Sequence, residues 1–245
     1  MPKFFLNSSD IGTNTAVISG SDAEHIRVLR LHEGDEIVIC DGVGSDYRCR
    51  ISEFGGGWVK ADILSTGRCP AEPDVRVTVL AGIPKQGERA DYIVQKCTES
   101  GASEIVFFLC KRCVARPDDK GMEKKIVRWQ RIAEEAAKQS GRGIIPRVSA
   151  VMDFASALKI AVQTDLPLFM YETGERVTLK SAIEAAGAVK TAAIITGPEG
   201  GFEKAEADAA AELGIKLCAM GPRILRCETA PVSALTALMY ATDNM

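Results

Sequence analysis

The sequence predicts an α/β protein in which a mostly parallel sheet flanked by helices follows a small β-barrel domain. Three observations predict this fold. The first 70 residues contain short alternating strands, glycine-rich turns and one helix. Residues 69–73, Cys-Pro-Ala-Glu-Pro, have the composition of a linker. After them strand and helix patterns alternate, which is typical of a parallel sheet covered by helices. We therefore expect two domains, residues 1–70 and residues 74–245.

The elements of the first domain follow from alternation and turn residues. Apolar side chains alternate with Arg48 and Arg50 in residues 47–51, and residues 59–63 alternate in the same way. Asp41-Gly42 and the three glycines at 55–57 are turn material. Residues 21–24, Ser-Asp-Ala-Glu, have the form of a capping box, so we expect a short helix carrying residues 25–30.

In the second domain, short apolar runs alternate with longer amphipathic stretches. We expect strands over residues 75–80, 104–109, 168–171, 192–195 and 216–219. We expect helices over residues 88–100, 123–140, 153–162, 179–186, 203–213 and 232–242. Ligands of such sheets bind beyond the carboxyl ends of the strands.

Composition indicates an ordinary globular chain. Of 245 residues, 46% are hydrophobic and 26% charged. No apolar run approaches the roughly 20 residues that span a membrane, and the N-terminus has no long apolar segment, so we expect neither membrane insertion nor secretion. Eight cysteines without an export signal favour reduced thiols, and hence a cytoplasmic protein.

Charge is distributed unevenly. The formal net charge is −3, but residues 111–147 hold eleven Lys/Arg and five Asp/Glu, a local excess of six positive charges. One face of the helix over 123–140 is mostly basic, because residues at spacings of three and four are Lys124, Arg128, Arg131, Glu135, Lys138 and Arg142. This face is either solvated surface or a nucleic-acid contact; Lys111, Arg112 and Arg116 just upstream favour the second interpretation.

Two loops near the C-terminus carry the strongest signal of a ligand site. Residues 194–202 read Ile-Ile-Thr-Gly-Pro-Glu-Gly-Gly-Phe, a strand running into a loop richer in glycine than a plain turn requires. Residues 220–231 read Met-Gly-Pro-Arg-Ile-Leu-Arg-Cys-Glu-Thr-Ala-Pro and again join a strand to a helix, for which Thr229 can be the cap. Loops at successive strand ends suggest one shared pocket, with surface salt bridging as the alternative for the second loop.

Common nucleotide motifs are absent. The dinucleotide fingerprint needs Gly-x-Gly-x-x-Gly after the first strand, and a phosphate-binding P-loop needs Gly-Lys-Ser/Thr; neither spacing occurs. A Rossmann-type oxidoreductase is therefore disfavoured. Cys110 and Cys113 form a lone C-x-x-C without further ligands nearby, so no metal site is expected. The apolar spacing around His25 and His32 favours packing over catalysis for both histidines.

The pair Gly-Pro-Glu-Gly-Gly-Phe and Gly-Pro-Arg-Ile-Leu-Arg-x-Glu-Thr-Ala closely resembles the RsmE family. The resemblance continues in residues 25–30, in the lysine-rich segment with Lys85, Arg89 and Lys96, and in Gln-Ser-Gly-Arg at 139–142. Ser100 stands where leucine is usual, and Pro231-Val232 depart from the pattern after Glu-Thr-Ala.

This resemblance implies a SPOUT-type fold with a C-terminal trefoil knot after a PUA-like RNA-binding barrel. It implies transfer of a methyl group from S-adenosyl-L-methionine to N3 of uracil 1498 in 16S ribosomal RNA, within the assembled 30S subunit, by a homodimer. A non-catalytic RNA-binding protein of the same fold, or a methyltransferase for another nucleotide, is the alternative. The target nucleotide, the general base and the assembly state of the substrate stay open.

Site residues follow from the resemblance and from the chemistry of the reaction. The predicted cofactor contacts are Ile195, Thr196, Gly197, Pro198, Glu199, Gly200, Gly201, Met220, Gly221, Ile224, Leu225, Arg226, Thr229 and Ala230. A deprotonated uracil N3 is an anion that arginines stabilise, so Arg226 and then Arg223 are the catalytic candidates. Glu228 is either the general base or an orienting group for an arginine. The predicted RNA contacts are Arg27, Arg30, Lys85, Arg89, Lys96, Arg112, Arg128, Arg131 and Arg142.

Overall fold

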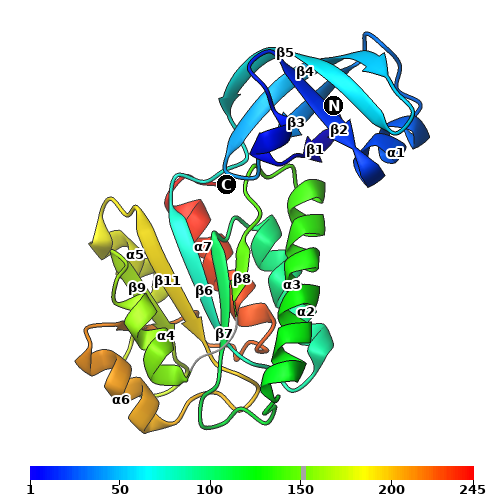
Figure 1. Ribbon diagram of the computed structural model, residues 1–245. Helices are drawn as coiled ribbons and strands as arrows, with labels where there is room; N and C mark the ends of the chain where they lie inside the picture. Colours follow the sequence, from blue (N-terminus) through cyan, green and yellow to red (C-terminus); the bar gives the residue numbers. More distant parts are fainter. Residues whose placement is uncertain (150–152) are drawn as a thin grey trace. The chain divides into compact units, whose positions relative to one another are not determined.

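The computed structural model describes residues 1–149 and 153–245, which form two compact units (Figure 1). The first unit comprises residues 1–72 and 137–145, and the second comprises residues 73–136 and 146–245. Each unit has its own hydrophobic core. The segment 137–145, which contains the last residues of the long helix Asp119–Gln139 and the chain that follows it, thus belongs to the N-terminal unit, and sequence periodicity did not indicate this.

The N-terminal unit is built on a five-stranded sheet in the order β1-β3-β4-β5-β2. Its strands are β1 (Lys3–Phe5), β2 (Thr15–Ser19), β3 (Glu36–Cys40), β4 (Ser45–Phe54) and β5 (Trp58–Arg68), with the 3-10 turn η1 (Ser8–Asp10) before β2. The sheet curls, as Figure 1 shows, but its strand order leaves β1 and β2 as the two edges among the residues described. The expected barrel is therefore a curled, open sheet over the residues described.

Helix α1 (Gly20–Val28) corrects the predicted start of the first helix. Ser19 is the N-cap and makes no side-chain capping bond, so the proposed capping box at residues 21–24 is wrong. Arg30 lies beyond the helix in the left-handed region, at φ 56°. A true capping box occurs instead at Glu203 and Glu206 of α6, where the sequence analysis named no capping signal.

The second unit contains a seven-stranded parallel sheet in the order β10-β12-β9-β11-β6-β7-β8. Its strands are β6 (Arg76–Gly82), β7 (Glu104–Phe108), β8 (Arg147–Ser149), β9 (Leu166–Met170), β10 (Val177–Thr178), β11 (Thr191–Thr196) and β12 (Lys216–Ala219). The expected strands over 75–80, 104–109, 168–171, 192–195 and 216–219 are confirmed as β6, β7, β9, β11 and β12, with small shifts of their ends.

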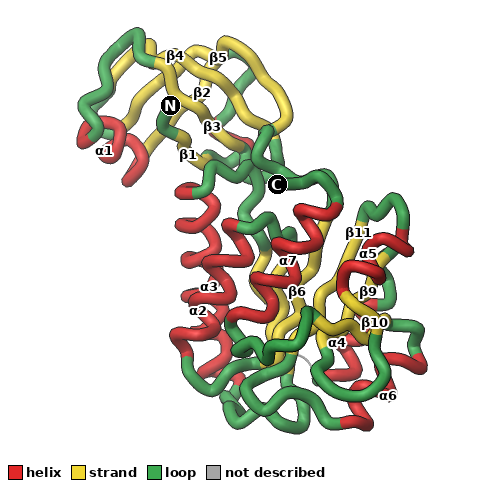
Figure 2. Tube along the Cα trace, turned by 180° about the vertical axis from the view of Figure 1, so that it is seen from behind, coloured by secondary structure: helices red, strands yellow, loops and turns green. Residues whose placement is uncertain are grey.

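Helices cover both faces of this sheet, as expected for a parallel arrangement. They are α2 (Gly87–Glu99), α3 (Asp119–Gln139), α4 (Phe154–Ala161), α5 (Leu179–Ala186), α6 (Lys204–Glu212) and α7 (Thr229–Ala241). Figures 1 and 2 place α7 on one face and α4 on the other, and α2 packs against α7. No helix among the residues described is long and apolar enough to span a bilayer.

Within the N-terminal unit, a buried ion pair joins Glu72 to Arg142 of the segment 137–145. The Glu72 carboxylate accepts from Arg142 Nε at 3.1 Å and Nη2 at 2.7 Å, and also from the backbone N–H groups of Gly143 and Ile144. The two side chains are only 4% and 3% exposed. This carboxylate therefore fixes residues 142–144 within the unit.

We predict that Glu72→Ala destabilises the N-terminal unit by about 3–5 kcal/mol, because it leaves a buried guanidinium without its counter-ion. Urea unfolding followed by far-UV circular dichroism measures the loss. Glu36→Ala is the matched control, since Glu36 also pairs with arginines, Arg48 and Arg50, but on the exposed surface. Equal stability of the two variants would contradict a structural role for the buried pair.

Candidate active site

The two glycine-containing loops meet in one pocket at the carboxyl edge of the parallel sheet. The pocket has a volume of about 470 Å³ and is lined by the loops after β11 and β12, by residues 170–172 after β9, and by Arg89 of α2. This is the position at which open α/β sheets bind ligands. The prediction of one shared pocket is confirmed by this geometry.

Close backbone packing explains the glycines of the first loop. A Cβ atom on Gly197 would lie 3.1 Å from Gly201 Cα and 3.2 Å from a ring carbon of Phe202, and Gly201 itself has φ +64°. At the end of β6, a Cβ on Gly82 would lie 2.5 Å from Pro198 Cδ and 2.7 Å from Pro198 N. Only glycine at these points lets the loop turn back on itself against β6.

An aromatic cluster anchors the end of the same loop. The Phe202 ring lies 4.3 Å from that of Phe169 in β9 and 6.2 Å, stacked, from that of Phe108 in β7; Phe154 of α4 closes the group at 5.8 Å. Phe202 is 6% exposed. Its burial fixes residues 197–201 relative to three elements of the core.

Predicted cofactor residues divide into three groups in the structure. The pocket is lined by the loop residues from Thr196 to Gly201 and by Met220, Gly221, Ile224, Leu225, Arg226 and Ala230. Ile195 lies fully buried inside β11 and does not reach the pocket, while Thr229 occupies the exposed first turn of α7. Ile224 lines the pocket but is 81% exposed, so its side chain is not enclosed by the rest of the chain.

One buried polar atom in this pocket has no partner. Thr196 is 1% exposed, and its Oγ1 makes no hydrogen bond with any residue the structure describes. A buried hydroxyl without a partner is costly. A ligand carrying a donor or an acceptor at this point would satisfy it, which fits an adenosyl group better than a purely apolar one.

The catalytic candidates occupy the second loop. Arg223 and Arg226 both line the pocket and are exposed, and neither side chain makes a hydrogen bond or ion pair with the residues that the structure describes. Glu228 is the N-cap residue of α7, and its carboxylate accepts from the Cys227 thiol at 3.2 Å. Two arginines are thus available to an anion, and the carboxylate is already engaged.

Several pocket residues were not anticipated from the sequence. Met170, Tyr171, Glu172 and Arg176 line the pocket from the segment after β9, which has no distinctive motif. Gly82 does not line the pocket but packs against Pro198 of its wall, and it was not anticipated either; a glycine ending a strand just before Ile-Pro-Lys was a signal that could have been used. What places these residues is the sheet order β12-β9-β11-β6, which periodicity does not provide.

The predicted RNA contacts fall into engaged and unengaged side chains. In the second unit, Lys96 pairs with Glu99 at 2.8 Å, Arg128 pairs with Asp91, Arg89 pairs with Glu199, and Arg112 donates to the Gly200 carbonyl at 3.1 Å. Arg131 and Lys85 are exposed, and neither side chain makes a hydrogen bond or ion pair with the residues that the structure describes.

In the N-terminal unit, Arg27 donates to the Gly55 carbonyl and lies over the Phe54 ring, whereas Arg30 is exposed. Arg142 is different from all of these, because its guanidinium is buried against Glu72 and is unavailable to a phosphate. The family motif and the helical spacing suggested that Arg142 contacts RNA. The structure instead gives Arg142 a structural role in the buried ion pair with Glu72.

The C-x-x-C pair lies directly beside the glycine loop. Cys110 and Cys113 are buried free thiols whose Sγ atoms are 3.5 Å apart. Between them, the Lys111 N–H donates to Glu206 at 2.9 Å, and Arg112 reaches Gly200. Within residues 1–149 and 153–245, no group of three or more His, Cys, Asp or Glu side chains is arranged to hold a metal ion.

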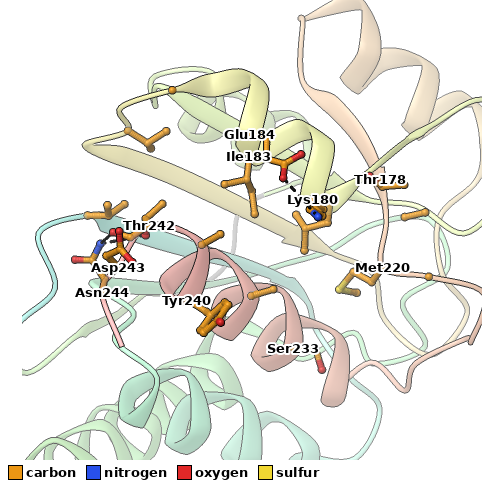
Figure 3. Close-up of a pocket in the computed structure, with 18 of the residues that line it drawn as sticks. Thr178, Lys180, Ile183, Glu184, Met220, Ser233, Tyr240, Thr242, Asp243 and Asn244 are labelled. Carbon is orange, nitrogen blue, oxygen red and sulfur yellow. Dashed lines mark hydrogen bonds and ion pairs between the residues drawn. The ribbon is translucent and has the colours of Figure 1, made fainter.

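A second and larger cavity, of about 1260 Å³, adjoins the first (Figure 3). It lies between α5 and α7, and its walls include Ile183, Met220 and Tyr240. The two cavities share Met220, Gly221, Arg223 and Leu225. The second loop thus separates an inner pocket from a broad apolar hollow whose Tyr240 is 76% exposed.

Comparison with known proteins agrees with this architecture. A family model described as an RNA methyltransferase domain matches residues 71–239, and one described as an RNA methyltransferase PUA domain matches residues 18–64. The chain is 35% identical to Ribosomal RNA small subunit methyltransferase E of Bacillus subtilis, covering 94% of this chain and 91% of that protein.

Solved structures are similar over the same extent. The chain matches a Ribosomal RNA small subunit methyltransferase E from Neisseria gonorrhoeae bound to S-adenosyl methionine, with a TM-score of 0.84, 29% identity and coverage of 98% and 97% of the two chains. A Legionella pneumophila methyltransferase in complex with the same cofactor matches with a TM-score of 0.81 and 25% identity, again over 98% and 97%. A parallel sheet with a glycine-loop pocket at its carboxyl edge, together with these matches along nearly its whole length, shows that the chain belongs to the ribosomal RNA small subunit methyltransferase E family.

Proposed function

We propose that this protein transfers the methyl group of S-adenosyl-L-methionine to N3 of a uridine in 16S ribosomal RNA, at the position equivalent to uracil 1498. The observation that carries the proposal is the pocket itself, whose lining includes both the buried, unsatisfied Thr196 hydroxyl and two arginines with unpaired side chains. Membership of the family supports the reaction class and the cofactor.

The residues of the pocket fit the cofactor. Thr196 Oγ1 and the glycine-rich backbone of residues 197–201 supply hydrogen-bonding groups, and Met220 and Leu225 supply apolar surface. When bound, S-adenosylmethionine supplies an electrophilic methyl group. The protein positions the uracil nitrogen in line with it, which is a large part of catalysis in a transfer of this kind.

In this mechanism, Arg226 and Arg223 activate N3 of the uracil. Loss of the N3 proton leaves a negative charge spread over N3 and the two carbonyl oxygens of the base. Arg226 and Arg223 stabilise that charge from the pocket rim, because neither is neutralised by a neighbouring carboxylate at hydrogen-bond distance. Glu228 orients this cluster, and we assign it no proton transfer.

We further propose that the N-terminal unit is a PUA-like RNA-binding domain and that the C-terminal segment passes through a trefoil knot. The PUA match over residues 18–64 supports the first proposal. In support of the second, β12 lies beyond β9, while α7 packs against β6 and β11. The loop between β12 and α7 must therefore cross back over the sheet edge, beside the glycine loop.

The protein acts in our proposal as a cytoplasmic homodimer on the assembled 30S subunit. The large hollow between α5 and α7, with exposed Tyr240, offers apolar surface for a second copy. The positive charges on α3, including the unpaired Arg131, face solvent and suit an RNA phosphate backbone.

Methyl transfer separates this function from that of a non-catalytic RNA-binding protein. We expect incubation with labelled S-adenosylmethionine and small ribosomal subunits from cells lacking the modification to place label on N3 of one uridine. Nuclease mapping and mass spectrometry identify the position. RNA binding without incorporation would refute the enzyme, and label on another nucleotide would refute the target.

Cofactor affinity tests the pocket. Gly197→Val and Gly221→Val should each abolish measurable binding in calorimetry, the first because the side chain meets Gly201 and Phe202, the second because a β-branched residue is strained at φ +105°. Gly214→Val is the matched control: Gly214 also has a positive φ, +80°, and open space around it, but lies outside the pocket. Normal affinity in both pocket variants would rule out this site.

Catalysis by arginine predicts a selective loss of rate. Arg226→Met should lower kcat by about 10²–10³-fold, as removal of a charge-stabilising group does in other sites. Cofactor affinity should change far less than kcat, because the lost interaction belongs to the transition state. Single-turnover rates with saturating cofactor provide the measurement, and a change confined to KM would argue against the role.

A further inference from the structure

We propose that Arg89 is a positioning residue that fastens both loops of the pocket to α2, rather than a contact for RNA phosphate. The inference rests on the proposed cofactor site, and it concerns how that site is held in shape. Family motif and charge alone place Arg89 among the RNA contacts; the structure gives it other partners.

Arg89 lies in the first turn of α2 and reaches both loops at once. Its Nη1 donates to Glu199 Oε1 of the glycine loop at 3.0 Å. Its Nε lies 3.8 Å from Glu228 Oε2 in the second loop, and Nη1 is 3.9 Å from the Cys227 sulfur. One guanidinium therefore contacts residues that lie about 110 and about 140 positions after Arg89 in the sequence.

Glu199 is held from a second direction as well. The Lys85 backbone N–H donates to both oxygens of its carboxylate, at 3.0 and 3.2 Å. On the other side of Arg89, the Cys227 thiol donates to Glu228 at 3.2 Å. The result is a continuous chain of interactions from the end of β6, through Glu199, Arg89 and Glu228, to the start of α7.

Charge balance argues against a phosphate contact. Arg89 faces two carboxylates, so a phosphate approaching it would bring its negative charge next to both. The three side chains are also partly withdrawn from solvent, at 25% exposed for Arg89, 27% for Glu199 and 16% for Glu228. By contrast, Arg131 of α3 is exposed, and its side chain makes no hydrogen bond or ion pair with the described residues.

Each loop also has anchors of its own. Phe202 fixes the first loop to the aromatic cluster, and the second loop continues into α7. In the part of the chain that the structure describes, the side-chain contacts of Arg89 join both loops to one helix, α2. Without them, the distance between the two walls of the pocket is less constrained.

Amide hydrogen exchange in the cofactor-free protein tests the clamp directly. Three hydrogen-bonded amides serve as probes: Lys85, which donates to Glu199, Gly201, which donates to Pro198, and Thr229, which donates to Arg226. Arg89→Met should speed exchange at all three by about ten-fold or more, while Arg89→Lys, which keeps the charge, stays within about three-fold of the native protein. Arg131→Met, the matched control, should change none of them.

Binding measurements complete the test. Arg89→Met should weaken S-adenosylmethionine binding by about ten-fold, as expected for loss of a charge-assisted hydrogen bond, and leave the salt dependence of RNA binding unchanged. Arg131→Met should show the reverse, with the salt slope reduced by about one and cofactor affinity kept. In a double-mutant cycle, adding Glu199→Gln to Arg89→Met should cost little beyond the Arg89→Met change alone, because the contact between the two side chains is already lost.

The outcomes separate the two proposals. Unchanged amide exchange and cofactor affinity in Arg89→Met, with a salt slope reduced by about one, would establish a phosphate contact and overturn the clamp. If the native protein fails to bind S-adenosylmethionine, the proposed function falls, and the exchange data still decide whether Arg89 holds the loops. If Arg89→Met does not fold, Glu199→Gln replaces it, and unchanged amide exchange at Gly201 and Thr229 in that variant would overturn the clamp.

Discussion

The contact between Gly82 and Pro198 is the constraint from which the geometry of the pocket follows. β6 and β11 are paired in parallel, with Ala81 opposite Thr196, so the chain leaves both strands at the same level. A side chain on Gly82 would occupy the position of the Pro198 ring, so only glycine allows the two chains to pass this closely. This approach brings Glu199 over the Lys85 amide and within reach of Arg89. The wall of the pocket thus depends on backbone packing before it depends on any catalytic group.

Strand and helix alternation could be read from the sequence because the second unit buries its strands on both faces. Five of the six residues of β11 are buried, which produces the apolar run that identified it. β8 and β10 contain three and two residues, too few to show a period, and neither was predicted. The start of α1 was misplaced because Ser21 and Glu24 had the right spacing for a cap, although the N-cap is Ser19, two residues earlier.

The candidate site was predictable only where a local motif carried it. The glycine and proline residues of both loops predicted a ligand site, and the structure brings the two loops together in one pocket. Tyr171, Glu172 and Arg176 reach the pocket because β9 lies between β11 and β12, an order that no local pattern reveals. Arg142 shows the converse error: a basic residue in a helical register with surface residues is buried, because its partner Glu72 is about 70 positions away.

The distribution of charge around the pocket bears on which group removes the N3 proton. Burial raises the pKa of Glu228, but hydrogen bonds from its own backbone N–H and from Cys227, with the charges of Arg89 and Arg226, outweigh burial and hold that pKa below its usual value. A carboxylate whose pKa is lowered binds a proton weakly, so it is poorly matched to the work of a general base near neutral pH. The same negative charge is well suited to orient the arginines beside it. In the mechanism we propose, the arginines make N3 more acidic and the proton leaves to solvent, so the reaction depends on how the two loops hold Arg226 against the base.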